Sequence, residues 1–134
     1  MMEERPAERA AESPFKGKTG LQRLLNACGY TLHGFSSAFR HEHAFRQEVF
    51  LAAILIPIAL LLDVGGTGKA LMIASVLLVL IVELLNSAIE AAVDRISFDQ
   101  HQLSKRAKDI GSAAVALSLI NVTAVWLLVV LDKL

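Results

Sequence analysis

The sequence predicts an all-α membrane protein in which an N-terminal amphipathic surface helix precedes three transmembrane helices. Hydrophobic residues make up 54% of the chain but aromatic residues only 6%, a composition that suits lipid-facing helices. Three apolar segments, at about residues 44–62, 70–93 and 110–131, are each long enough to cross a hydrocarbon layer of roughly 30 Å. A soluble helical bundle fits less well, because so little polar helix surface lies between these segments.

Charge and cysteine usage limit the function classes. The 134-residue chain has a formal net charge of zero and no basic stretch interleaved with aromatic residues, which excludes nucleic-acid binding. Cys28 is the only cysteine, so an intramolecular disulfide and a cysteine-based metal site are excluded. Residues 1–18 are polar, of mixed charge and without an apolar core. They predict a disordered tail rather than a cleavable signal peptide.

The segment at residues 19–40 is predicted to be an amphipathic helix. Its apolar residues recur in steps of three and four and therefore share one helical face: Leu21, Leu24, Leu25, Cys28, Leu32, Phe35 and Phe39. A partner helix could cover such a face in a soluble protein, but here a membrane span follows directly. We expect the helix to lie at the membrane surface, with residues 19–134 forming one membrane domain.

Polar connections separate the three predicted spans. Val49–Leu62 is apolar apart from Pro57 and becomes long enough to span the membrane when it is extended back to Ala44. Residues 63–69 are expected to form a tight turn, and residues 94–109 are expected to form a polar loop.

The basic residues predict the orientation of the chain. Two groups lie on one side of the predicted membrane: Lys16, Lys18, Arg23, Arg40 and Arg46 before the first span, and Arg95, Lys105, Arg106 and Lys108 between the second and third. The opposite side carries only Lys69 and Lys133. The excess of basic residues places the N-terminus and the loop at 94–109 in the cytosol, as in a multi-pass protein of the inner (cytoplasmic) membrane.

One face of the second span carries polar side chains. Glu83, Asn86, Glu90 and Asp94 follow one another in steps of three and four, so they fall within a stripe roughly 80° wide. A charged group near the bilayer centre costs about 2.5–3.5 kcal/mol on insertion scales, so two Glu on an apolar helix need a compensating role. We expect a site in which one carboxylate binds a cation and the other accepts a proton from a hydroxyl.

Two other function classes can use the same residues. In a non-enzymatic membrane assembly, the Glu and Asn side chains would hold helices or subunits together. A transporter or proton relay could also use intramembrane carboxylates, but it would carry polar residues along the full depth of its spans. Here they crowd into the cytosolic half of the second span, which favours a one-sided enzyme site.

The sequence around these residues resembles the prokaryotic diacylglycerol kinase family. Glu83–Arg95 reads E-L-L-N-S-A-I-E-A-A-V-D-R, similar to the family signature E-x-x-N-[ST]-A-I-E-x-x-V-D. Three further blocks are similar in order and spacing: Ala27–Tyr30, Glu42–Glu48 and Arg106–Ala114. The likeness extends from about Gly20 to the end of the chain.

The resemblance implies a small homotrimeric kinase with composite sites between subunits, which uses ATP and Mg²⁺ to phosphorylate the primary hydroxyl of diacylglycerol and form phosphatidic acid. It implies that Glu83 is the general base and that Asn86 supports the site. Glu42 and Glu90 would hold the Mg²⁺ that bridges the ATP phosphates, and would thereby also contact ATP.

The resemblance also implies two ligand-binding groups. The further nucleotide contacts are Arg23, Tyr30, Asp99, His101, Lys108 and Asp109, with Asp99 standing where the family has Glu. Besides Glu83, the lipid contacts are Ala44, Phe45, Arg46, Gln47, Glu48 and Ser112.

Plainer roles and a second substrate remain open. Asp109 could cap the third span, and Arg46, Gln47 and Glu48 could form an interfacial hydrogen-bonding cluster without a ligand. Kinases of similar fold phosphorylate undecaprenol, a polyprenyl alcohol that would use the same base and metal. The block at residues 44–48 and the overall likeness favour diacylglycerol.

Overall fold

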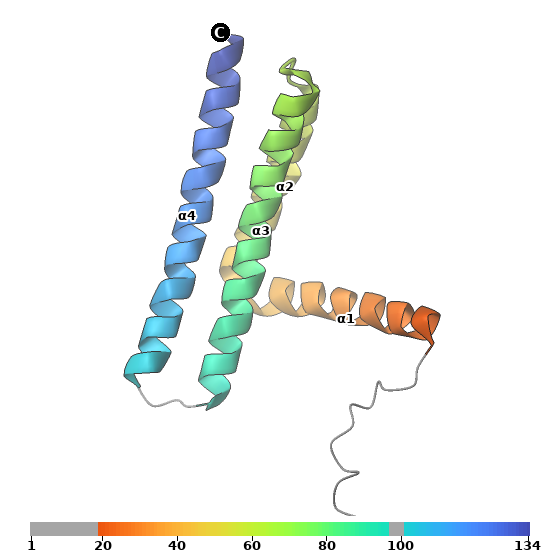
Figure 1. The fold of residues 1–134 in the computed structure, drawn as a ribbon, viewed down its shortest axis with the longest axis vertical. Coiled ribbons are helices and arrows are strands. Elements are labelled where there is room, and N and C mark those ends of the chain that lie inside the picture. The colour runs from red at the N-terminus through yellow and green to blue at the C-terminus, as the bar shows by residue number, and fades with distance from the viewer. Residues whose placement is uncertain (1–18, 97–100) are drawn as a thin grey trace, which may run out of the picture. The chain divides into compact units, whose positions relative to one another are not determined.

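The computed structural model describes residues 19–96 and 101–134, and all the regular structure in these two ranges is α-helical. Four helices follow one another: α1 (Gly20–His41), α2 (His43–Leu61), α3 (Gly65–Ile96) and α4 (Gln102–Lys133) (Figure 1). Of these, α2, α3 and α4 are long and apolar enough to cross a membrane. The predicted all-α class with three membrane-spanning helices is confirmed. The predicted tail at residues 1–18 lies outside the described residues.

The chain divides into two units between Ser36 and Ser37. In the first unit, Thr19 caps the start of α1, because its Oγ1 accepts a hydrogen bond from the backbone N–H of Gln22 at 3.3 Å. The apolar side chains predicted to share one face of α1 are exposed in this unit, including Leu21, Leu24 and Leu32. The predicted amphipathic helix is therefore present.

The second unit begins with the last turn of α1, which is joined closely to α2. The Arg46 guanidinium donates hydrogen bonds of 2.9 Å to the backbone carbonyls of Phe39 and Arg40. It thereby satisfies carbonyl groups that the end of α1 leaves without helical partners. The rings of Phe39 and Phe50 meet edge to face, with centroids 6.1 Å apart.

Helix α3 packs against both α2 and α4, and it runs antiparallel to α4 (Figure 1). The buried residues of α2 are Phe45, Ala52 and Ala59, spaced by seven, so they share one face. On α4 the buried residues are Gly111 and Ser118, again seven apart. All of these residues except Phe45 are small, so they let helix backbones approach closely, and this close packing stabilises helix association in lipid.

Polar contacts link the helices at the end of the bundle where α4 ends and α2 connects to α3. Lys133 Nζ lies 2.6 Å from Asp63 Oδ2, which ties the end of α4 to the connection between α2 and α3. Lys69 Nζ donates a 2.7 Å hydrogen bond to the carbonyl of Leu60. Nearer the middle, the indole Nε1 of Trp126 donates to the carbonyl of Met72 at 3.2 Å and links α4 to α3.

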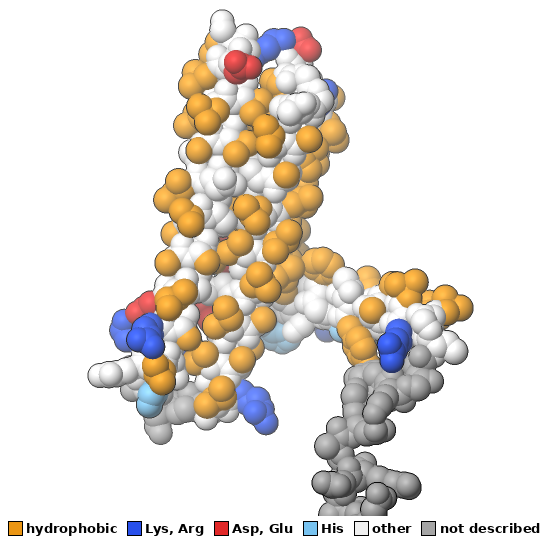
Figure 2. Space-filling view, viewed as in Figure 1, with side chains coloured by type: hydrophobic (Ala, Val, Ile, Leu, Met, Phe, Trp, Pro, Cys, Tyr) orange, Lys and Arg blue, Asp and Glu red, His pale blue; other side chains and the backbone are white. Residues whose placement is uncertain are grey.

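Apolar side chains cover the visible length of the bundle, and charged side chains gather toward its ends (Figure 2). Leu117, Ile120 and Leu128 on α4 are each more than half exposed. Such surface suits contact with lipid or with other helices, and it is typical of transmembrane helices.

The connections between α2 and α3 and between α3 and α4 are both shorter than the sequence predicted. The predicted turn at residues 63–69 is wrong beyond Val64, because α3 already begins at Gly65, whose φ of +71° makes the sharp change of direction. The predicted polar loop at residues 94–109 is also wrong over most of its length, because α3 continues to Ile96 and α4 begins at Gln102. A 32-residue helix is about 48 Å long, so α3 and α4 extend beyond a hydrocarbon layer of roughly 30 Å. Their polar ends therefore remain helical.

Candidate active site

Four polar side chains of α3 are buried: Ser75, Glu83, Asn86 and Ser87. Glu83 is 5% exposed and Asn86 is 8% exposed, whereas Glu90, two turns beyond Glu83, is half-buried. At 1.5 Å per residue, Glu83 and Glu90 stand about 10 Å apart along the helix axis. Buried ionisable groups in a membrane helix are costly, so this stretch of α3 is the first candidate for a functional site.

Asn86 connects this stretch to Glu90. Its Nδ2 donates a hydrogen bond of 3.2 Å to Glu90 Oε1. Its Oδ1 is buried and has no hydrogen-bond partner among the described residues, and the same holds for the hydroxyl of Ser87. The amide thus has one end fixed on a carboxylate and the other end free of hydrogen bonds.

Carboxylates from two helices share this environment. Glu83 is desolvated by its surroundings and lies within range of the charges of Glu90 and Glu42, and its own charge acts on Glu48. Glu42 is half-buried at the N-cap of α2, and Glu48 lies one turn and a half further along that helix. No Lys, Arg or His side chain in the described part of the chain forms an ion pair with any of the four.

This concentration of negative charge can accommodate a cation. Within the described ranges, no group of three or more His, Cys, Asp or Glu side chains is arranged to hold a metal by itself. Mg²⁺ does not require such a group, because it is usually bound by one or two carboxylates together with phosphate oxygens and water. Half-buried Glu42 and Glu90 fit that kind of metal site.

The residues predicted to bind nucleotide are only partly brought together. Lys108 of α4 lies 2.6 Å from Asp94 of α3, and Asp109 forms an ion pair of 2.5 Å with Lys105. Asp109 is not the helix cap that its position could have supplied. His101 is the N-cap of α4, because its Nδ1 accepts a hydrogen bond of 3.1 Å from the backbone N–H of Leu103.

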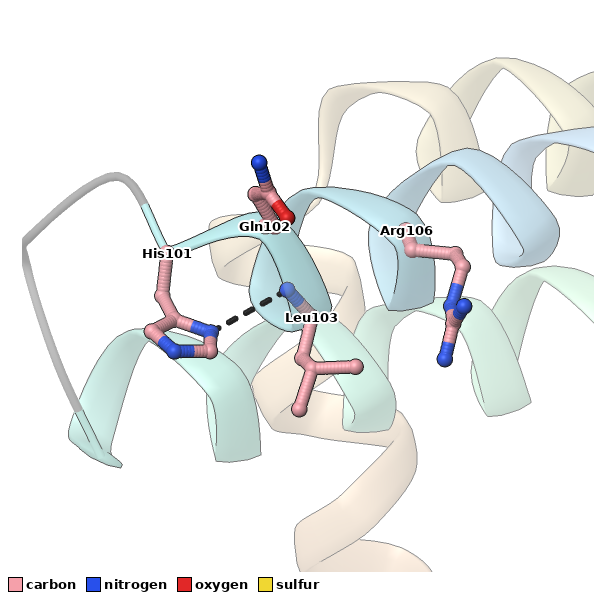
Figure 3. Close-up of a pocket in the computed structure, with 4 residues that line it drawn as sticks. All are labelled: His101, Gln102, Leu103 and Arg106. Atoms are coloured by element: carbon pink, nitrogen blue, oxygen red, sulfur yellow. Dashed lines mark hydrogen bonds between the residues drawn. The ribbon is translucent and has the colours of Figure 1, made fainter.

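A shallow hollow of about 420 Å³ lies at the start of α4 (Figure 3). His101, Gln102, Leu103 and Arg106 line it. Of these, only His101 was predicted to contact nucleotide. Arg106 lies four positions after Gln102 and therefore shares its helical face. Asp94 is a second residue without a predicted role, and its pairing with Lys108 across two helices has no local signal in the sequence.

Two of the other predicted nucleotide contacts belong to the first unit. Arg23 and Tyr30 belong to the part of α1 in the first unit, and both are exposed there. Asp99 lies outside the described residues.

The predicted lipid-binding block at residues 44–48 lies in the first two turns of α2. Phe45 is buried at 3% exposure, while Ala44 and Gln47 are exposed. The Arg46 guanidinium is occupied by the carbonyls at the end of α1. Glu48 has one buried carboxylate oxygen, Oε2, without a hydrogen-bond partner in the described ranges. Ser112, from α4, is exposed.

The model of the prokaryotic diacylglycerol kinase family matches residues 29–130 of this chain. The chain belongs to this family. The family resemblance predicted from the sequence is thereby confirmed. Membership of this family and the three long apolar helices together indicate that the chain is a multi-pass membrane protein.

Curated members of the family are similar over nearly their whole length. A protein of Pseudomonas aeruginosa named diacylglycerol kinase is 61% identical over 119 residues, covering 89% of this chain and 97% of that protein. A diacylglycerol kinase of Haemophilus influenzae is 54% identical over 108 residues, covering 81% of this chain and 92% of the relative. One from Escherichia coli K12 is 49% identical over 108 residues, with coverage of 81% and 88%.

Proposed function

We propose that this protein is a diacylglycerol kinase, which transfers the γ-phosphoryl group of ATP to the primary hydroxyl of diacylglycerol and forms phosphatidic acid and ADP. The observation that carries the proposal is the buried Glu83, one turn from an Asn86 that is hydrogen-bonded to Glu90, inside a membrane helix. Relatives up to 61% identical carry the name diacylglycerol kinase, which supports this substrate.

In the proposed reaction, Glu83 acts as the general base. Its carboxylate takes the proton of the lipid hydroxyl while the hydroxyl oxygen bonds to the γ-phosphorus, and the bond from that phosphorus to the β–γ bridging oxygen breaks. Glu83 suits this role because it is desolvated and because no Lys, Arg or His side chain in the described ranges forms an ion pair with it. Asn86 would support the site by holding Glu90 in place.

Glu42 and Glu90 would hold the Mg²⁺ that accompanies ATP. When bound, the ion would neutralise phosphate charge, which is a large part of catalysis in phosphoryl transfer. The two carboxylates come from separate helices, and their charges both act on Glu83. Without a cation, the negative charges of Glu42, Glu90 and Glu83 would repel one another. This repulsion would favour the binding of a metal ion.

The nucleotide would lie toward the start of α4. Lys108 and Asp109 would contact it there, together with His101 at the hollow of Figure 3. Lys108 could exchange its carboxylate partner Asp94 for a phosphate oxygen, because both groups of this ion pair are substantially exposed. Arg23, Tyr30 and Asp99 would add contacts from the rest of the chain.

Lipid would reach Glu83 past the first turn of α2. The half-buried Glu48 has an unsatisfied oxygen that could accept a hydrogen bond from the glycerol backbone of the lipid. Ala44, Phe45, Arg46, Gln47 and Ser112 would line the same approach. Glu83 lies deeper along α3 than Glu90, so a lipid hydroxyl and a soluble nucleotide would approach it from opposite directions.

The protein would work as a homotrimer in the inner (cytoplasmic) membrane, with its N-terminus and active site on the cytosolic side. The excess of basic residues before α2 and near the α3–α4 connection supports this orientation. The broad exposed apolar surface of α4 supports association with other copies as well as contact with lipid.

The proposal can be tested by assaying the purified protein in mixed micelles that contain Mg²⁺ and ATP. Diacylglycerol and undecaprenol are supplied in parallel, and phosphate transfer to each lipid is measured. Transfer to diacylglycerol is expected. A preference for undecaprenol would keep the mechanism and change the substrate. Transfer to neither lipid by a folded protein would contradict the kinase function and favour a structural membrane assembly.

A further inference from the structure

Gly111 of α4 faces the carboxamide of Asn86 on α3. Gly111 and Asn86 are both buried. A Cβ atom added to Gly111 would collide with Asn86 Oδ1 and would also lie 3.4 Å from the Asn86 side-chain carbon Cγ. The carboxamide therefore fills the space that a side chain at position 111 would otherwise occupy.

The Oδ1 end of the Asn86 side chain packs against Gly111 and makes no hydrogen bond in the described ranges. Asn86 Oδ1 lies where a Cβ atom at position 111 would overlap it. The opposite end of the carboxamide is the Nδ2 that donates to Glu90 at 3.2 Å. This distance is at the long end of the usual range for N–H···O bonds, so a small rotation of the amide would break the bond.

We propose that Gly111 is a positioning residue of the active site, which seats the carboxamide of Asn86 and through it orients the carboxylate of Glu90. The catalytic part of this inference rests on the proposed function, in which Glu90 holds Mg²⁺. The structural part stands by itself, because it concerns only the contact between Gly111 and Asn86. Any side chain at position 111 would compete with the amide for the same space.

A Gly111→Ala substitution forces one of two changes. Either the Asn86 carboxamide turns away from α4 and releases Glu90, or α4 moves away from α3. Turning the end of the Asn86 side chain is the smaller change and would cost the hydrogen bond to Glu90, whereas moving α4 would separate a closely packed pair of helices. Elsewhere in a helix, replacing Gly by Ala increases stability, so a loss of stability at this position would be specific to the contact.

Gly66→Ala is a matched control. Gly66 is also helical, and a Cβ atom there would have no neighbour within 4 Å. It lies 17 positions before Glu83, or about 25 Å along α3, and has no role in the proposed site. Its substitution should leave the midpoint of unfolding unchanged or raise it, and should leave the kinetics unchanged.

The structural test is a double-mutant cycle on the protein in detergent without Mg²⁺ or ATP. Thermal unfolding is measured for the parent, Gly111→Ala, Asn86→Ala and the double variant. Gly111→Ala should lower the unfolding midpoint in the parent but lower it little, or raise it, in the Asn86→Ala background. If the Gly111→Ala variant folds only when it is combined with Asn86→Ala, that result would support the same conclusion. Equal losses in both backgrounds, or failure of both to fold, would overturn the inference.

The functional test is the Mg²⁺ dependence of phosphate transfer at saturating lipid. Positions that orient metal ligands typically change metal affinity or activity by about 10–100-fold. Folded Gly111→Ala should therefore need about tenfold more Mg²⁺ for half-maximal rate, with a smaller change in the KM for lipid. An unchanged Mg²⁺ requirement would contradict the link to Glu90. If even the parent lacks kinase activity, the proposed function fails, while the unfolding cycle still decides whether Gly111 seats Asn86.

Discussion

Lys108 of α4 and Asp94 of α3 form an ion pair of 2.6 Å between Nζ and Oδ1, which joins the two helices beyond Glu90. Both side chains are partly exposed, at 40% and 54%, so the pair is accessible to a ligand. Exposed ion pairs contribute little to stability. In the proposed site, the positive charge of Lys108 would therefore contribute more to binding a phosphate of ATP than to the stability of the fold.

Replacing Lys108 with Met should raise the KM for ATP about tenfold, since a hydrogen bond to a charged group contributes about 1.5–3 kcal/mol. The unfolding midpoint should change little. Steady-state kinetics with varied ATP measure the first effect. Asp94→Asn is the informative comparison, because it breaks the same ion pair but leaves the Lys108 charge. Equal KM increases in the two variants would show that Lys108 acts only through its partner.

Glu90→Gln should raise the Mg²⁺ concentration needed for half-maximal rate by at least about tenfold, because a neutral amide replaces a charged oxygen ligand. The Asn86 Nδ2 can still donate to the remaining amide oxygen, so the local packing should be retained. Titration of activity with Mg²⁺ at fixed ATP measures the shift. Loss of rate with an unchanged Mg²⁺ requirement would argue against Glu90 as a metal ligand.

Trp126→Phe should weaken the packing of α4 on α3 without changing catalysis. The substitution removes the hydrogen bond from the indole Nε1 to the carbonyl of Met72, which also accepts a hydrogen bond of 2.7 Å from Ser75 Oγ. Interhelical hydrogen bonds in membranes contribute about 0.6 kcal/mol on average, so the free energy of unfolding should fall by about that amount. Denaturant titration in micelles measures it. A lower kcat with unchanged stability would contradict a purely structural role.

The contact between Asp63 and Lys133 should make a small, acid-sensitive contribution to stability. The hydrogen bond and charge of Lys133 lower the pKa of Asp63 below its ordinary value. A lowered folded-state pKa means that this stability is present above the unfolded-state pKa and is lost as the pH falls through the folded-state pKa. The effect is small because Asp63 is 97% exposed.

Asp63→Asn tests this contact. Its unfolding midpoint should be slightly below that of the parent at neutral pH. The difference should disappear at a pH well below the ordinary aspartate pKa of about 3.9. A difference that persists unchanged in acid would show that the substitution acts through something other than the charge of Asp63.

The sequence was sufficient to predict the presence of the four helices and the face of α3 on which Glu83, Asn86 and Glu90 lie. Helical spacing places Glu83, Asn86 and Glu90 on one stripe, and the cost of burying carboxylates in lipid indicates that the stripe has a function. Both arguments are local to one helix. They need no knowledge of how the helices pack.

Contacts between helices could not be predicted in this way. Gly111 lies 25 positions after Asn86, and nothing near it in the sequence indicates which side chain it accommodates. The pair of Asp94 and Lys108 depends in the same way on the register of α4 against α3. The helix ends were misplaced for a related reason. The polar character of residues 94–109 was taken to mark a loop, although a helix that leaves the membrane can continue in water.

Glu83→Gln is the most direct test of the proposed mechanism, because it removes the basic carboxylate and keeps the size of the side chain. The assay measures ATP-dependent phosphate transfer to diacylglycerol by folded parent and variant protein with saturating Mg²⁺. A positioned general base contributes about 10²–10⁴-fold, so kcat should fall by that factor while the KM for ATP changes little. A variant that is fully folded and retains the parent kcat would contradict the assignment of Glu83 as the base.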